Sequence, residues 1–115
     1  MSMEKQYWTK EIDATISVCD ENGIIVEMND KAINAFKEEG GEKLIGTKLL
    51  DCHPDSAKKK LEELIAAKKP NYYTTEKNGV KHFVYHTPWF EDGVYKGFVE
   101  MILDIPFEMP HYVRD

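Results

Sequence analysis

The stretch VCDENGIIVEMNDKAINAF, residues 18–36, contains a turn signal between two apolar runs and a helix start directly after them. Asn22-Gly23 is among the strongest hairpin signals, because both residues tolerate the positive φ that a tight turn requires. Three apolar residues alternate in the second run, as in a strand with one buried face: Ile24, Val26 and Met28. Asn29 or Asp30 can cap a helix, which Gly40-Gly41 ends. The stretch predicts a β-hairpin followed by a helix.

The remainder of the chain predicts one longer helix and three more strands. After Pro54, four apolar residues recur with helical spacing: Ala57, Leu61, Leu64 and Ile65. From residue 71 to residue 105, three strand patterns are separated by Asn78-Gly79 and Asp92-Gly93. This order predicts an α+β fold, with a five-stranded antiparallel sheet and helices packed on one face. We expect a cleft between the helices and that face.

Alternation in the last two strands predicts which side chains face the helices. In the last strand we assign one set of residues to the core: Gly97, Val99, Met101, Leu103 and Ile105. The opposite set is then directed outward: Phe98, Glu100, Ile102 and Asp104. In the strand before it, we expect Phe83, Tyr85 and Thr87 to face the cleft, and His82 and His86 to face solvent or a partner.

Composition limits the classes of function. With 115 residues the chain has room for one domain, and its net charge of −6 argues against nucleic-acid binding, which needs a basic surface. No apolar run approaches the roughly 20 residues that span a bilayer, and charges interrupt the N-terminal segment where a signal peptide would be apolar. We therefore expect a cytoplasmic protein with no membrane partner, in which Cys19 and Cys52 are free thiols.

The motifs in this order resemble a PAS domain. Asp20 and Gly23 match the D-x-x-G turn of that family, Asn29 matches the Asn before its first helix, and Ile45-Gly46 matches a short helix and glycine that often follow. The ending GVYKGFVEMILDI, residues 93–105, looks like the last PAS strand. The resemblance covers residues 14–105. It leaves residues 1–13, which we expect to form a helical extension around Tyr7, Trp8 and Ile12, and a C-terminal tail at 106–115.

This resemblance implies a sensory or interaction module of the bacterial type rather than an enzyme. PAS domains are usually attached to a kinase, a cyclase or a DNA-binding domain, and the chain has no room for one, so we expect output through a partner protein or through self-association. Some PAS domains hold heme, flavin or a small organic ligand. The reactive-cysteine motif of flavin photoreceptors is absent around Cys52, so flavin is not expected.

His53 is the residue for which two interpretations stay open. In the PAS fold its segment lines the cleft, and heme-binding members take an axial histidine from this neighbourhood. Asp51, Pro54 and Asp55 are, however, residues typical of a helix start, where a histidine can simply bind a backbone carbonyl. We favour a role in the cleft wall over iron ligation. The full set of cleft candidates is His53, Asn34, Phe36, Leu50, Tyr73, Tyr85 and Met101.

The other candidate chemistries are rejected. His82 and His86 form an H-x-x-x-H motif, but on a strand they lie roughly 13 Å apart and cannot share a metal. Cys52 and His53 are adjacent, and adjacent side chains seldom meet in a catalytic pair. No carboxylate pair and no Gly-rich phosphate loop stands out in the sequence. We expect no metal site, unless His53 binds heme, and no enzymatic activity.

Aromatic residues in the last three strands indicate a self-association surface. We predict a homodimer formed by the outer sheet face and the N-terminal segment, with Tyr7, Trp8, Phe98 and Ile102 as interface candidates. Two hypotheses for function remain. One is a PAS module that senses a small ligand in its cleft, and the other is an interaction module with a filled core and no ligand.

Overall fold

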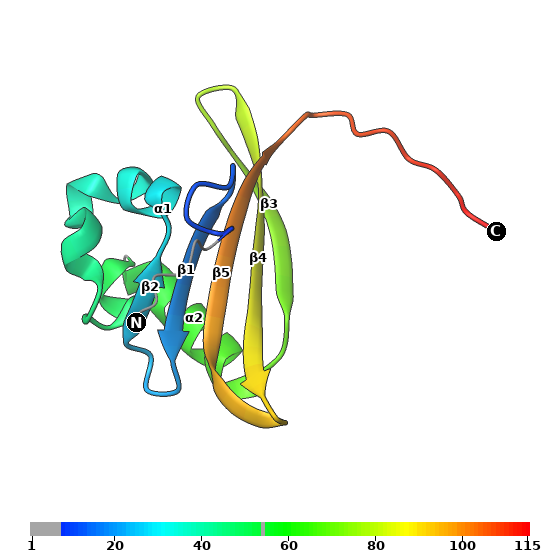
Figure 1. The fold of residues 1–115 in the computed structure, drawn as a ribbon. Helices are drawn as coiled ribbons and strands as arrows, with labels where there is room; N and C mark the ends of the chain where they lie inside the picture. Colours follow the sequence, from blue (N-terminus) through cyan, green and yellow to red (C-terminus); the bar gives the residue numbers. More distant parts are fainter. Residues whose placement is uncertain (1–7, 54) are drawn as a thin grey trace.

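Strands from both ends of the chain meet in the middle of one sheet (Figure 1). β1 (Thr15–Asp20) pairs antiparallel with β2 (Ile25–Met28) on one side and with β5 (Val94–Ile105) on the other. β4 (Val80–Glu91) follows β5, and β3 (Asn71–Lys77) forms the edge, so the strand order is β2-β1-β5-β4-β3. This computed structural model describes residues 8–53 and 55–115. It confirms the predicted α+β fold with a five-stranded antiparallel sheet.

The β1–β2 turn depends on Asp20. Its carboxylate accepts hydrogen bonds from the backbone N–H groups of Asn22 and Ile24, at 2.9 and 3.0 Å. Gly23 closes the turn with a φ of 78°, in the left-handed region that glycine adopts without strain. The D-x-x-G pattern therefore has a direct structural cause.

All the helices of the described residues lie between β2 and β3 in sequence and cover one face of the sheet (Figure 1). They are α1 (Asp30–Ala35), three short 3₁₀ turns η1 (Lys37–Glu39), η2 (Gly41–Leu44) and η3 (Leu49–Cys52), and the longer α2 (Asp55–Ala67). The core under them combines Cys19 and Phe98 of the sheet with Ala32, Leu49 and Leu61 of the helices. Across the described ranges, no helix is long and apolar enough to cross a membrane.

The predicted facing of β5 is wrong. Phe98 and Glu100 are only 1% and 7% exposed, and Phe98 packs with Leu61 in the core, so this set faces the helices. Met101 pairs with Ile16 on the opposite face, because directly paired residues share a face. Both faces of β5 are rich in apolar residues, and the row on the helix side contains two charged residues, Glu100 and Asp104, which hydrophobic alternation would assign to solvent.

The same inversion applies to β4. His86 is paired with Glu100, and Val84 with Ile102, so both side chains belong to the layer under the helices. Tyr85 is paired with Met101 and therefore lies on the outer face, against our prediction. The error has one cause: a histidine was assigned to solvent, although its partner across the ladder is an acid that can pair with it in the interior.

Gly97 is required where β5 passes β1. A Cβ atom at this position would lie 1.9 Å from the carbonyl oxygen of Cys19, and the φ of Gly97 is +148°. The same carbonyl accepts a hydrogen bond from Nε1 of Trp89 at 3.1 Å. The close approach of the two strands therefore admits no side chain at residue 97.

The described residues on either side of the sheet region, 8–13 and 106–115, form neither helix nor strand. Residues 8–13 form turns and bends instead of the predicted helix, and Tyr7 lies outside the described residues. Residues 106–115 contain no helix or strand and extend away from the sheet (Figure 1). The tail therefore contributes no strand to the sheet, in agreement with its prolines at 106 and 110, which cannot donate to a ladder.

Candidate functional site

A cavity of about 430 Å³ lies between α2 and the edge of the sheet that β3 and β4 form. Apart from Lys60, its wall is apolar where α2 contributes, and it is polar where the strands and the end of η3 contribute. The lining residues are His53, Ala57, Lys60, Leu61, Leu64, Asn71, Tyr73 and His86. The volume falls in the range of pockets that hold small organic molecules.

His53 lies where η3 ends, at the cavity wall. Its Nδ1 is 3.0 Å from the carbonyl oxygen of Leu49. A carbonyl can only accept, so this ring nitrogen carries the hydrogen. The other nitrogen, Nε2, lies 4.0 Å from Oε2 of Glu100. The helix-start interpretation and the cleft interpretation of His53 are therefore compatible, because one nitrogen binds backbone and the other faces the buried carboxylate.

His86 is the second imidazole at this carboxylate. Its Nε2 lies 2.9 Å from Oε2 of Glu100, and the two residues are only 3% and 7% exposed. The ring also packs near the rings of Tyr73 and Phe98, with centroids 5.8 and 6.2 Å away. Among the described residues, Nδ1 of His86 has no hydrogen-bond partner.

Electrostatics favour an ionised Glu100. Burial alone would raise the pKa of this carboxyl, but hydrogen bonding and charge from His53 and His86 outweigh burial and lower the pKa from 4.5 to about 2. In turn, the Glu100 carboxylate raises the pKa of His53 above 6.5, against the opposing effect of burial. Burial, followed by the Glu100 charge, also raises the pKa of the Tyr73 hydroxyl.

The predicted cleft residues do not gather at one place. His53 and Tyr73 line the cavity, whereas Phe36 borders a narrow space on the other side of His53. Leu50 and Asn34 lie at two separate surface hollows. Tyr85 and Met101 lie on the outer face, as described above.

Four polar residues of the cavity and of the carboxylate cluster were missed by the sequence prediction: Lys60, Asn71, His86 and Glu100. A register shift hid two of them. The Asp92-Gly93 turn alone would pair His86 with Val99, and the irregularity between Trp89 and Phe90 pairs it with Glu100 instead. An acid and a base paired across a ladder stabilise each other. The turn signal alone therefore could not indicate that pair.

The opposite face of the sheet is apolar over four strands. Its members are identified by register: Ile16, Val18, Tyr72, Phe83, Tyr85, Val99, Met101 and Leu103. The rings of Tyr72 and Tyr85 are stacked, with centroids 5.2 Å apart. We call this set the outer face. Phe98 and Ile102 were predicted to belong to it, and both instead lie on the helix side, while Trp8 is 73% exposed.

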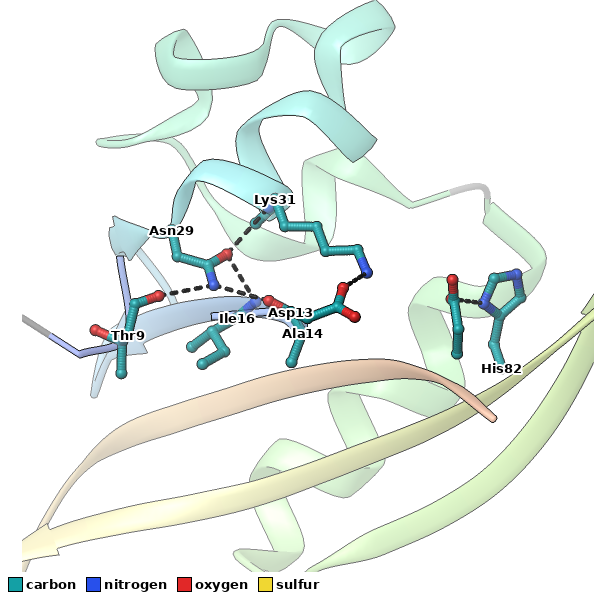
Figure 2. A network of polar contacts seen from close by, with 9 residues as sticks. Thr9, Asp13, Ala14, Ile16, Asn29, Lys31 and His82 are labelled. Carbon is teal, nitrogen blue, oxygen red and sulfur yellow. Dashed lines mark hydrogen bonds and ion pairs between the residues drawn. The ribbon is translucent and has the colours of Figure 1, made fainter. Parts of the chain in front are cut away.

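Asn29 ties the start of the sheet to α1, as Figure 2 shows. Its Oδ1 accepts hydrogen bonds from the backbone N–H groups of Ile16 and Ala32, at 3.1 and 3.0 Å. Its Nδ2 donates to the carbonyl oxygens of Thr9 and Ala14, at 2.9 and 2.8 Å. The oxygen of this buried amide thus accepts two hydrogen bonds and its nitrogen donates two, which uses its full capacity. Asn29 is therefore a structural residue and not a ligand contact.

The imidazoles are poorly placed for iron ligation. Nδ1 of His53 binds the carbonyl oxygen of Leu49, and its Nε2 faces the Glu100 carboxylate at 4.0 Å. His86 directs Nε2 at the same carboxylate, and its Nδ1 is buried. Within the described ranges, no group of three or more His, Cys, Asp or Glu side chains is placed to hold a metal ion.

Comparison with known proteins supports the fold. No family model matches the chain, and no curated protein matches its sequence. Among solved structures, it is similar to the PAS domain of BvgS from Bordetella pertussis, with 15% identity and a TM-score of 0.66 over 85% of this chain and 81% of that chain. A sensory box histidine kinase from Vibrio cholerae gives 14% identity and a TM-score of 0.65 over 85% and 86%.

A third similar structure is the PAS domain of the histidine kinase ThkA. It shares 23% identity with a TM-score of 0.63, over 79% of this chain and 99% of that chain. These similarities agree with the strand order β2-β1-β5-β4-β3 and with the helices on one face. The chain has the PAS fold.

Proposed function

We propose that this chain is a signalling module that senses a small organic ligand in the cavity between α2 and the β3–β4 edge. The observation that carries the proposal is the 430 Å³ cavity, whose wall combines apolar side chains of α2 with polar groups of His53, Asn71 and Tyr73. Pockets of this size and mixed lining are typical of sites for small organic molecules. The alternative is an interaction module that binds no ligand.

Several features suit ligand sensing. The apolar side chains of Ala57, Leu61 and Leu64 provide a surface for an apolar body, while His53, Asn71 and Tyr73 offer polar groups for orientation. His53 and Glu100 connect this wall to the centre of the sheet. The similar structures include PAS domains of sensor histidine kinases, and we extend a sensory role to this chain as part of the proposal.

Output would pass through self-association or a partner protein. We propose that a homodimer forms through the outer face, because its apolar residues lie on four strands and all of them except the buried Ile16 keep part of their surface accessible. β4 and β5 supply residues to both faces, so a change at His86 or Glu100 can reach Tyr85 and Met101 through the same strands.

A cavity-filling variant tests the sensory proposal. Native mass spectrometry of freshly purified protein should show a bound small molecule, and Ala57→Trp should abolish this extra mass. Ala67→Trp is the control, because Ala67 is exposed and does not line the cavity. If the wild type carries no molecule and none from a metabolite extract raises its melting temperature, the ligand-free interaction module is the better description.

Hemin addition tests the remaining alternative. We expect no Soret shift that depends on His53, because both nitrogens of that ring already face other groups. A sharp shift that disappears in His53→Ala would make the protein a heme sensor.

A further inference from the structure

Four large apolar side chains of the tail, residues 106–115, project into water. Their exposed fractions rise with distance from the sheet: Phe107 51%, Met109 58%, Tyr112 70% and Val113 83%. The other six residues of the tail are also exposed, so the described part of the chain leaves the whole tail uncovered. A segment that is only solvated is normally poor in aromatic and branched apolar residues. The composition of the tail therefore indicates a segment that packs on a surface.

The tail is also restricted to extended conformations. Pro106 and Pro110 have a fixed φ, and each disfavours a helical conformation at the residue before it. Figure 1 shows the tail running away from the end of β5 and from the helices. A segment restricted in this way loses less conformational entropy when it binds than a flexible segment does.

The outer face is the apolar surface to which the tail is directly connected. Ile105 belongs to the same row of β5 side chains as Leu103, so the tail begins where this row of the outer face ends. The most exposed member of the outer face is Tyr72, at 61%, which lies on the edge strand β3 and stacks on Tyr85. Face-to-face contact between the centres of two outer faces would leave this aromatic pair at the margin.

We infer that two copies of the chain exchange their tails, so that the apolar side chains of each tail pack on the Tyr72–Tyr85 stack of the other copy. The inference rests on the outer-face homodimer of the proposed function and names the segment that completes it. It does not depend on a ligand in the cavity.

The tail is long enough to reach a second copy. Stacked sheets lie about 10 Å apart, whereas ten extended residues span roughly 33 Å. About three residues are enough to cross between the sheets, and the remainder, which includes Met109, Tyr112 and Val113, can lie along the partner.

A second copy is a better site for the tail than the sheet of its own chain. The tail runs away from that sheet, and folding back onto it would require the chain to reverse at Pro106. A two-fold arrangement satisfies both tails and both outer faces with one kind of contact.

Matched triple variants of the full chain test the exchange. The apolar variant combines Phe107→Ser, Met109→Ser and Tyr112→Ser. The polar control changes three other residues of the same segment and leaves the net charge unchanged: Glu108→Ser, His111→Ser and Arg114→Ser. All six side chains are exposed, so neither variant removes a contact from the fold.

We expect the apolar variant to weaken the dimer by about 100-fold, because it removes the apolar area of three side chains from the interface. The polar control should leave the dissociation constant of the dimer unchanged. Sedimentation over a range of concentrations measures both constants.

Photo-crosslinking between labelled copies shows where the tail lies. A photoreactive phenylalanine derivative replaces Tyr112 in the unlabelled chain, which is incubated with an equal amount of nitrogen-15-labelled wild-type chain until the subunits exchange. We expect crosslinked peptides that join an unlabelled tail to labelled β3 or β4. Complete absence of such mixed-label peptides would mean that each tail stays on its own chain, and would overturn the inference.

The outcomes separate the inference from the proposed homodimer. A dimer that is unaffected by the apolar variant but lost in Met101→Asp overturns the tail exchange and leaves the outer-face dimer. Mixed-label crosslinks that map only to the helix side of the sheet also overturn the exchange, in favour of another docking surface. A monomeric wild type overturns both the exchange and the homodimer.

Discussion

His86 on β4 and Glu100 on β5 are direct partners across the ladder, and their side chains meet 2.9 Å apart in the layer under the helices. The pair replaces the apolar contact that would normally occupy this position. A buried carboxylate is tolerated when its partners are in place, and removal of one partner is costly. The pair therefore links the stability of the sheet to the wall of the cavity.

Glu100→Gln should destabilise the protein. Glutamine can still accept a hydrogen bond from His86, but it removes the negative charge that His53 and His86 share. We expect the free energy of unfolding to fall by about 2–3 kcal/mol, measured by urea denaturation at pH 6. The control is Glu63→Gln on the exposed side of α2. Indistinguishable midpoints for the two variants would contradict the buried role of Glu100.

Stability should depend on pH through the same cluster. The pKa of Glu100 is lower in the folded state, about 2 against 4.5, so its contribution is present above pH 4.5 and is lost as the pH falls toward 2. The pKa of His53 is higher in the folded state, so its contribution is present below pH 6.5 and is lost as the pH rises through the folded value.

The difference between wild type and Glu100→Gln isolates these two effects. We expect the difference in unfolding free energy to be largest between about pH 4.5 and 6.5 and to shrink on both sides. Urea denaturation at intervals of about one pH unit measures it. A difference that stays constant from pH 3 to pH 9 would show that the carboxylate is unpaired in solution.

Much of the fold could be predicted because local signals agree with it. The turn at Asp20 and Gly23, the cap at Asn29 and the glycine-ended hairpins each have a cause within a few residues. Which row of β5 side chains lies under the helices was not predictable from hydrophobicity. β5 is apolar on both sides, and the row under the helices includes Glu100, which is acceptable there only because His53 and His86 come from other segments.

The site could be predicted only in part for the same reason. His53 was predicted to line the cleft because the order of elements resembles a PAS domain, in which the segment before the long helix lies at the cleft wall. His86 and Asn71 are brought to the cavity by β3–β4 pairing, which is a tertiary contact. Their facing depends on the register as a whole and on the acid across the ladder.

Asn29→Asp should destabilise the protein although it changes few atoms. An aspartate cannot donate to the carbonyl oxygens of Thr9 and Ala14, and would place a negative charge against both. We expect a loss of about 3 kcal/mol in unfolding free energy. Asn34→Asp in the same helix is exposed and serves as the matched control. Equal melting temperatures for the two variants would mean that the amide network does not form in solution.

Gly97→Ala should prevent folding or reduce stability severely. The new methyl group would meet the Cys19 carbonyl oxygen at 1.9 Å, so β1 and β5 would have to separate. Gly93→Ala is the control: its φ of +80° is unfavourable for alanine, but no atom lies within 4 Å of the new group. We expect the control to cost about 1 kcal/mol. Similar circular dichroism melting curves for both would contradict the close strand approach.

Met101→Asp should dissociate the proposed homodimer and leave the monomer folded. Met101 lies near the middle of the outer face, paired with Ile16 and Tyr85. A carboxylate there would have to lose its water in an apolar interface, which is costly when it has no partner. Ile45→Asp is the control, because Ile45 is an exposed apolar residue at the end of η2 and does not belong to the outer face. Sedimentation at micromolar concentration should give twice the 13.3 kDa chain mass for the wild type and the control, and one chain mass for Met101→Asp. Two results would refute the outer-face dimer: a monomeric wild type, or a Met101→Asp variant that remains dimeric.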